Sequence, residues 1–333
     1  MFELLGLCLL LAALLTFNSF ASLMTAGAWR VLSPVVRNSS ATTRAQLLFA
    51  LRVVPALLSI AIVLTLLVPA YLLYEPRHTT EQIGLKLEIL ALVSAVGLGL
   101  AISRAVGAWR ATERLTADWL RHAVRIDIDG ISIPTFCIEH VFPVIAIVGI
   151  RRPRLFVARQ VLDLLSVDEI AAAIAHENSH LQTRDNFKRG FLRACRDALL
   201  MTPCGRLLDR AWSDAAEEAA DEGAARKGET VALDLASALV KIARTIPNGA
   251  RPAMPAGMLL VGDTEDRSGI RSRVRRLMDL AANKPGSQRA TSSLPIIGIV
   301  FCALTITVMV ANNAPVVFPR VHALIEYAVL ILK

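Results

Sequence analysis

The residues with the clearest chemical meaning are two histidines and a glutamate in the segment HENSH, at positions 176–180. His176 and His180 are four residues apart, so on a helix, which turns about 400° over that interval, both imidazoles project from one face. Two ring nitrogens placed in this way can share one zinc ion at about 2.0–2.1 Å. Glu177 can then take a proton from a metal-held water and pass it to a leaving amine. The spacing therefore predicts hydrolytic zinc chemistry, with Glu177 as the catalytic base.

A catalytic zinc site needs a third protein ligand and leaves its fourth position to water. The segment EEAAD, at positions 217–221, is the best source, because Glu217 and Asp221 would share one face of a helix. We expect Glu217 to bind the metal and Asp221 to accept a hydrogen bond from a ligand histidine. Glu218 is the rival ligand, on a different face. Asp185 either orients a ligand histidine or simply begins the next helix.

The segments around these residues predict an α+β domain that is mostly helical. Positions 124–163 favour strands, with a hairpin turn at Asp129-Gly130. Ser166 and Glu169 form a capping box that begins the helix carrying HENSH. Further helices are predicted at 185–201, 207–227, 231–245 and 268–282, with a Pro- and Gly-rich loop at 246–262.

The composition requires an apolar solvent for part of the chain. Of the 333 residues, 54% are hydrophobic, and the mean hydropathy is +0.52, whereas soluble domains are less apolar. A membrane-spanning helix needs about 20 apolar residues. Four segments approach that length, at about 4–29, 54–74, 85–109 and 294–312. The tail 313–333 is predicted to be short and extracytoplasmic, on the outer membrane face or capping the fourth span, because its apolar stretch 328–332 is too short to cross.

The arginines between the spans predict the orientation. Arg30, Arg37, Arg44 and Arg52 fill the first loop without an acidic residue, so the positive-inside rule places that loop in the cytoplasm and the N-terminus outside. Residues 1–109 then hold three spans, and residues 110–290 form a cytoplasmic domain. This arrangement is typical of a bacterial inner-membrane protein.

The same topology makes the other four histidines poorer candidates for zinc ligands. His78 and His322 fall on the opposite side of the membrane, and His122 and His140 precede the zinc helix as surface or strand residues. A run of arginines between 267 and 276 lies before the fourth span. Such a run usually anchors a helix at the membrane surface, and binding of a substrate is the alternative.

The charge pattern argues against a nucleic-acid-binding protein, and the cysteine content argues against a protein held together by disulfides or a cysteine zinc site. The net charge is +8, but no basic motif is interleaved with aromatic residues, so we expect the lipid bilayer and not nucleic acid as the partner of these charges. The five cysteines are odd in number and include no CxxC pair, which argues against a disulfide framework or a cysteine zinc site.

The segment AAAIAHENSHLQTRDN resembles the H-E-x-x-H-x-x-x-x-D-N stretch of membrane gluzincins, and EEAAD is similar to their E-x-x-x-D. Two families compete. The segment VIAIVGIRRPRLFVARQVLDLLSVDEI is similar to a run that precedes the zinc helix in BlaR/MecR-type antibiotic-sensing peptidases, and three spans, a zinc domain and one span match their order. HtpX-like peptidases are the second choice, because they usually place further spans after the zinc helix.

The resemblance implies a zincin-like fold in which His176, His180 and Glu217 bind one zinc ion, Glu177 is the base, and Asp221 supports a ligand. It also implies cleavage of a cytoplasmic or membrane-proximal protein, such as a transcriptional repressor, or self-cleavage on signalling. The antibiotic sensors carry a large domain after the fourth span, where this chain has about twenty residues. The alternatives are an HtpX-like quality-control protease and a non-catalytic signalling scaffold.

Overall fold

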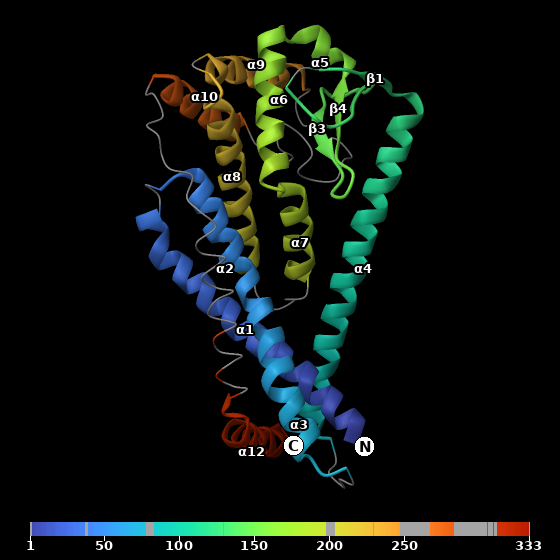
Figure 1. Ribbon diagram of the computed structural model, residues 1–333, viewed down its shortest axis with the longest axis vertical. Helices are drawn as coiled ribbons and strands as arrows, with labels where there is room; N and C mark the ends of the chain where they lie inside the picture. Colours follow the sequence, from blue (N-terminus) through green and yellow to red (C-terminus); the bar gives the residue numbers. More distant parts are fainter. Residues whose placement is uncertain are drawn as a thin grey trace.

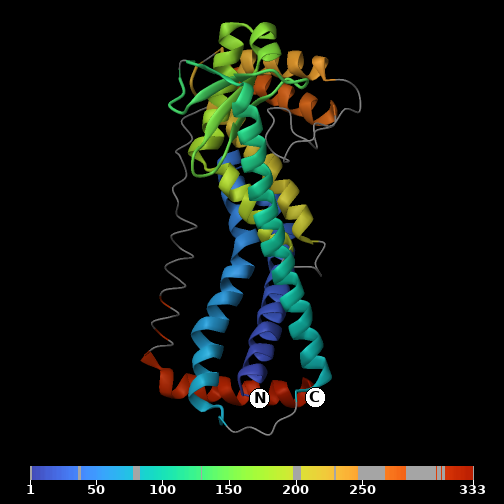
Figure 2. The same cartoon turned by 90° about the vertical axis from the view of Figure 1, so that its right-hand side faces the viewer.

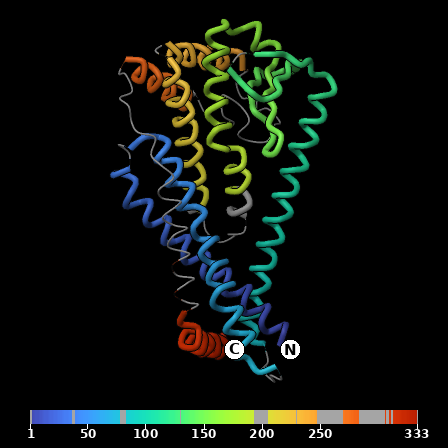
Figure 3. Tube along the Cα trace, viewed as in Figure 1, coloured from blue at the N-terminus to red at the C-terminus, as the bar shows by residue number. Residues whose placement is uncertain are grey.

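A computed structural model describes residues 2–36, 39–77, 83–128, 130–197, 204–228, 230–246, 267–282, 305, 309 and 312–332. The long helices converge at one end of the molecule and run toward the other end, where a small sheet and shorter helices lie (Figure 1). Both ends of the chain lie at the end of the molecule that is farthest from the sheet (Figure 3).

Among the described residues, four segments are long and apolar enough to cross a membrane. The first three correspond to predicted spans, whereas the fourth is the tail, which was predicted to be too short to cross. The first is α1 (Phe2–Val36). The second runs without a break through α2 (Ala41–Ile62), the π-helical turn η1 (Val63–Leu67) and α3 (Val68–Tyr74). The third is α4 (Leu85–His122), and the fourth is α12 (Ala314–Leu332).

The π-helical turn η1 interrupts the second segment just before Pro69. Proline has no backbone N–H and cannot donate to the carbonyl four residues earlier, which here belongs to Thr65. A single wider turn accommodates this missing bond without ending the helix. The segment therefore remains one rod from Ala41 to Tyr74.

Helix α4 is longer than the predicted third span, which was expected to end near Trp109. Its 38 residues rise about 57 Å at 1.5 Å per residue, whereas the hydrocarbon core of a bilayer is about 30 Å thick. The polar part after Trp109 continues as helix because it contains no Gly or Pro before His122. This part reaches the sheet (Figure 1), so the apolar segments and the sheet domain are joined by helix.

The prediction that four arginines fill the first loop was wrong. Arg30 lies in α1, Arg44 and Arg52 lie in α2, and only residues 37–40 separate the two helices. Arg52 is 2% exposed, and its Nε donates to Oδ1 of Asp209 at 3.0 Å. Arg44 forms an ion pair with Glu218. Two of these arginines therefore attach α2 to the helix that contains Asp209 and Glu218.

The last described helix, α12, changes the prediction for the tail. The predicted span 294–312 lies almost wholly outside the described residues. The tail is one 19-residue helix, longer than the apolar stretch 328–332 alone indicates. It runs across the ends of α1, α3 and α4 (Figure 2). Its buried residues Ile325 and Val329 pack in one cluster with Leu5 and Leu87.

The sheet has four strands in the order β1-β2-β4-β3. The strands are β1 (Val124–Ile126), β2 (Thr135–Ile138), β3 (Ile145–Val148) and β4 (Arg154–Ala158). Strands β2 and β4 are parallel, and the other pairs are antiparallel.

The predicted hairpin is only partly correct. Val124 pairs with Cys137 and Ile126 with Thr135, so the return strand begins later than a two-residue turn at Asp129-Gly130 requires. Asp129 lies outside the described residues, and Gly130 has a φ of 88°. The turn between β3 and β4 contains Gly149 at a φ of 101°, which is a conformation that favours glycine.

Most helices of this domain agree closely with the sequence pattern, but residues 159–163 were predicted as strand and are helical, because the last strand ends at Ala158. The helices are α5 (Arg159–Leu164), α6 (Val167–Gln182), α7 (Asp185–Asp197), α8 (Cys204–Ala225), α9 (Val231–Thr245) and α10 (Arg267–Ala282). The core contains residues from β3, β4, α6 and α9, including Phe156, Ile174 and Leu239. Helix α6 is therefore fixed against the sheet on one side and against α8 and α9 on the other.

The start of α6 is fixed by the predicted capping box. The Ser166 side chain accepts from the Glu169 N–H, and the Glu169 carboxylate accepts from the Ser166 N–H at 2.8 Å. The same carboxylate accepts from Ser237 at 2.6 Å and from Lys241 at 2.7 Å, both on α9. Burial opposes ionisation of Glu169, but the hydrogen bonds from Lys241, Ser237 and Ser166 outweigh it and lower its pKa to about 2.

We expect Glu169→Gln to lower the free energy of unfolding by about 1.5–3 kcal/mol at pH 7, the value of hydrogen bonds to a charged group. The folded-state pKa is about 2 against an ordinary value of 4.5, so this stabilisation is complete above 4.5 and is lost as pH falls toward 2. Thermal unfolding at several pH values measures the effect. The exposed neighbour Asp168 is the control, and equal losses in Asp168→Asn and Glu169→Gln would refute the prediction.

Candidate metal centre between helices α6 and α8

Helix α6 carries the three residues of the HENSH prediction into the interior. His176 is 0% exposed and Glu177 is 6% exposed, and the His180 side chain is 11% exposed. Helix α8 approaches α6 closely at Gly223, where a Cβ atom would lie 2.5 Å from Oγ of Ser179. Glycine at this position therefore lets α8 lie near enough for its side chains to reach the histidines.

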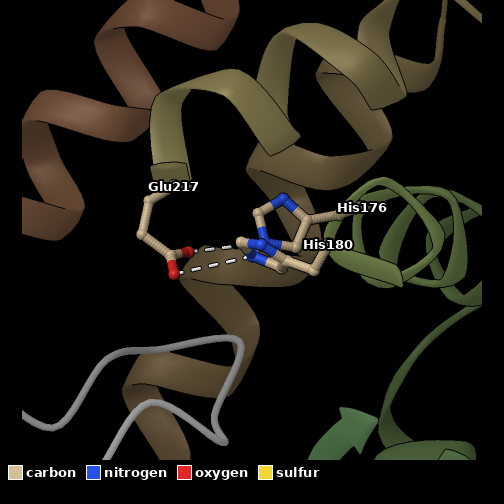
Figure 4. A group of neighbouring side chains, drawn as sticks. All are labelled: His176, His180 and Glu217. Carbon is tan, nitrogen blue, oxygen red and sulfur yellow. Dashed lines mark hydrogen bonds and ion pairs between the residues drawn. The ribbon is translucent and has the colours of Figure 1, made fainter. Parts of the chain in front are cut away.

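Figure 4 shows both imidazoles directed at the carboxylate of Glu217. The two Nε2 atoms of His176 and His180 lie 3.2 Å apart. Nε2 of His176 is 3.4 Å from Oε2 of Glu217, and Nε2 of His180 is 3.5 Å from its Oε1. The packing of α6 against α8 thus brings Glu217 to two histidines that lie far from it in the sequence.

These separations fit a tetrahedral metal ion. Ligand atoms at about 2.0–2.1 Å from such an ion lie about 3.3–3.4 Å from one another. The Nε2–Nε2 distance and the contact of each imidazole with one oxygen of Glu217 are close to this value, and the two imidazoles contact different oxygens. Oε2 of Glu217 is buried and accepts no hydrogen bond from the described residues, although Nη1 of Arg273 lies 3.4 Å from it. A buried acceptor beside two imidazole nitrogens is suited to a cation, and the set of two histidines and one carboxylate suits zinc.

The outer nitrogen of each imidazole contacts a different aspartate. Nδ1 of His176 lies 2.9 Å from Oδ1 of Asp221, and Nδ1 of His180 lies 2.8 Å from Oδ2 of Asp185. Carboxylates at Nδ1 keep Nε2 directed inward and raise the basicity of the ring. Asp185 fulfils both of its predicted alternatives, since it contacts His180 and also begins α7.

Two arginines were missed as part of the site. Arg273 of α10 is 5% exposed and donates to Asp221 from Nε at 3.0 Å and from Nη2 at 2.7 Å. Arg189 of α7 donates to Oε1 of Glu217 at 2.6 Å. The prediction that the arginines at 267–276 anchor a membrane helix is therefore wrong for Arg273. It is also wrong for Arg276, which forms ion pairs with α8.

The carboxylates stabilise the protonated form of both imidazoles. Burial opposes a charge on His180, but the charge of Glu217 and hydrogen bonds to Asp185 and Glu217 raise its pKa to about 10. The pKa of His176 is also raised, because Asp221 and Glu217 outweigh burial. Conversely, the charge of His180 holds the pKa of Glu217 well below its usual range despite burial. The carboxylates around the two imidazoles therefore favour a positive charge between helices α6 and α8, in addition to the charges of Arg189 and Arg273 that already pair with Glu217 and Asp221.

Glu177 lies beside the edge strand β3. Its Oε2 accepts from the Ile147 N–H at 3.2 Å, and Nδ2 of Asn186 donates to the Ile147 carbonyl at 2.7 Å. Burial raises the pKa of Glu177, although the charges of His180 and His176 partly oppose this. A carboxylate with a raised pKa can accept a proton near neutral pH and release it again.

The remaining predicted alternatives lie elsewhere. Glu218 points to another face of α8, where it pairs with Arg44 and Arg276. His140 accepts from the Phe142 N–H near the sheet, and His322 lies on α12. Of the two acidic ligand candidates, Glu217 alone lies in the cluster with the histidines.

We expect Asp221→Asn to lower the stability of the metal-free protein by about 3–5 kcal/mol, because it breaks the buried ion pair in which Arg273 donates two hydrogen bonds. Thermal unfolding in the presence of a chelator measures this effect. Adding Arg273→Met to the variant should recover part of the loss, since the buried charge that has lost this ion pair is then removed. Wild-type stability in Asp221→Asn would contradict this account of the ion pair.

Neither a scan against protein-family models nor a search of curated proteins gives a match to this chain.

Proposed function

We propose that this protein is a membrane-bound zinc metalloendopeptidase with its active site between α6 and α8. The observation that carries the proposal is the cluster of His176, His180 and Glu217, with Glu177 one residue from a ligand and buried beside it. Structural zinc sites usually have four protein ligands, whereas catalytic sites have three and leave a position for water. Three ligands and an adjacent carboxylate therefore favour hydrolysis over a structural role.

A zinc ion bound at this site would polarise a peptide carbonyl and acidify a water molecule. His176, His180 and Glu217 would hold the cation. Asp221 and Asp185 keep the imidazoles turned with Nε2 inward.

The base is Glu177, which accepts the proton of the attacking water and donates it to the nitrogen of the departing amine. Because its pKa is raised, Glu177 holds the proton more readily than an ordinary carboxylate between accepting it from water and donating it to the amine. Helices α6 and α8 are packed on a sheet and on each other, so these groups are held in place before substrate arrives.

The substrate is proposed to be a protein in the cytoplasm or at the membrane surface. Arg30 near the end of α1 and Arg37 in the short connection to α2 favour a cytoplasmic domain under the positive-inside rule. The resemblance to BlaR/MecR-type peptidases favours regulatory cleavage of a repressor or of the chain itself. Capture of a bound protein by a Glu177→Gln variant, compared with capture by a variant that lacks His180, would identify it. A repressor supports regulatory cleavage, whereas many misfolded membrane proteins support quality control.

Hydrolysis of unfolded casein by the full chain in detergent tests the activity. We expect cleavage to be lost on treatment with a chelator and restored by Zn²⁺. Casein hydrolysis that continues in excess chelator would contradict zinc catalysis. A folded, zinc-loaded protein that cleaves neither casein nor itself would favour the signalling scaffold.

A further inference from the structure

A second group of ligand-type side chains lies at the end of the molecule far from the sheet (Figure 1). Glu75 caps the C-terminus of α3, and His322 and Glu326 lie one turn apart on α12. Each offers one ligand atom, and the three atoms lie within 4.8 Å of one another. An imidazole and two carboxylates from two separate elements thus converge where α12 crosses the ends of the long helices.

The contacts within this group are too long for hydrogen bonds. Nδ1 of His322 lies 3.8 Å from Oε2 of Glu75, and Nε2 lies 3.8 Å from Oε1 of Glu326. Nδ1 is buried and has no hydrogen-bond partner among the described residues. A buried polar atom without a partner destabilises the folded protein. The Glu75 side chain that faces this nitrogen is only 3% exposed.

The surrounding contacts hold the imidazole at this position. The ring of Tyr74 stacks on that of His322, with centroids 6.1 Å apart. Ile325 is buried in the contact of α12 with the long helices. Nearer the end of α12, Nζ of Lys86 donates to the carbonyl of Ile331 at 3.2 Å. His322 is therefore presented to Glu75 by a docked helix and is not a free surface side chain.

We propose that Glu75, His322 and Glu326 form a second metal site, which takes a divalent transition-metal ion such as Zn²⁺. One imidazole with two carboxylates suits Zn²⁺ and Cu²⁺, whereas Ca²⁺ and Mg²⁺ prefer oxygen ligands alone. A single ring nitrogen binds the ion, and Nδ1 is the one that faces the buried Glu75. The Glu326 side chain is 47% exposed, so it has room to turn and complete the site.

A metal at this position would fasten α12 to the end of α3, because its ligands belong to both elements. The site lies at the opposite end of the protein from His176, His180 and Glu217. It is therefore a place where a metal ion outside the proposed cytoplasmic compartment can bind. The proposal does not depend on peptidase activity.

Zinc binding to the full chain carrying His176→Ala and His180→Ala tests the proposal, since among the described residues only the second group then keeps its histidine. We expect equilibrium dialysis against Zn²⁺ and elemental analysis to find about one ion per chain, and Zn²⁺ to raise the thermal midpoint. Adding His322→Ala should abolish both effects. His122→Ala is the matched control, because His122 is exposed on α4 and belongs to neither group.

A second measurement avoids reliance on the double variant. The otherwise unchanged chain should bind two Zn²⁺ ions and the His322→Ala chain one. Equal zinc content in the two chains would overturn the proposal, as would an equal loss in His122→Ala.

Discussion

Glu177→Gln is expected to reduce casein hydrolysis by about 10²–10⁴-fold, the usual contribution of a general base, while the zinc content stays unchanged. Glutamine keeps the size of the side chain and an oxygen that can accept from the Ile147 N–H, so the contact to β3 persists. It cannot take a proton from the attacking water. The kcat of hydrolysis and elemental analysis of the same preparation measure the two effects.

The neighbouring residue supplies the control for this variant. Asn178 is next on α6 but is not part of the metal cluster, so Asn178→Ala should keep most of the activity. Full activity in Glu177→Gln would show that another group carries the proton. Loss of activity together with loss of zinc would mean that the substitution disturbed the site as a whole.

Glu217→Gln should weaken zinc binding by more than about 100-fold, because removing a direct ligand costs at least as much as removing a supporting carboxylate. Activity should fall with zinc occupancy and recover partly in excess Zn²⁺. The ion pair between Arg189 and Glu217 is also lost, so the metal-free variant should unfold at a lower temperature than wild type. Competition with a chelator of known affinity measures the change in zinc binding.

Glu218→Gln is the matched control, since Glu218 is adjacent on α8 but pairs with Arg44 and Arg276 instead of facing the histidines. It should keep wild-type zinc affinity, although its lost ion pairs affect stability. Equal zinc affinity in Glu217→Gln and wild type would exclude Glu217 as a ligand. A weaker affinity in Glu218→Gln than in Glu217→Gln would reverse the assignment.

The local features of the zinc helix could be predicted because their causes lie close together in the sequence. The capping box of Ser166 and Glu169 fixes the start of α6, and the four-residue spacing of His176 and His180 puts both on one face. Helix α9 has the predicted bounds of 231–245, since its apolar residues repeat at helical spacing. These signals need no knowledge of the tertiary fold.

The charged partners of the site could not be predicted because they depend on contacts between distant helices. Arg273 sits in a basic run that is typical of a membrane anchor, and only the packing of α10 against α8 reveals that it binds Asp221. Arg52 similarly has the pattern of a loop arginine, yet α2 extends far enough to bury it against Asp209. Positive charge near an apolar segment predicts membrane orientation, but it does not show which arginines pair inside the protein.

The sequence pattern also underestimated the lengths of helices α4 and α12. Hydropathy detects where the apolar part of α4 ends, but helix-forming residues continue the same rod to His122. At the tail, the polar residues His322 and Glu326 shorten the apolar stretch, so the helical periodicity of α12 is missed. Both cases arise because apolar content and helical structure need not end at the same residue.

The central claim is that His176, His180 and Glu217 bind a zinc ion. The zinc content of a chain in which the proposed second metal site has been removed tests this claim most directly. The full chain carrying His322→Ala, purified and dialysed against limiting Zn²⁺, is the suitable protein, and His180→Ala is then added to it. We predict about one zinc ion per chain in the first protein and essentially none in the second, with both folded by circular dichroism. A folded His322→Ala chain without zinc, or an equal zinc content in the two proteins, would contradict the claim.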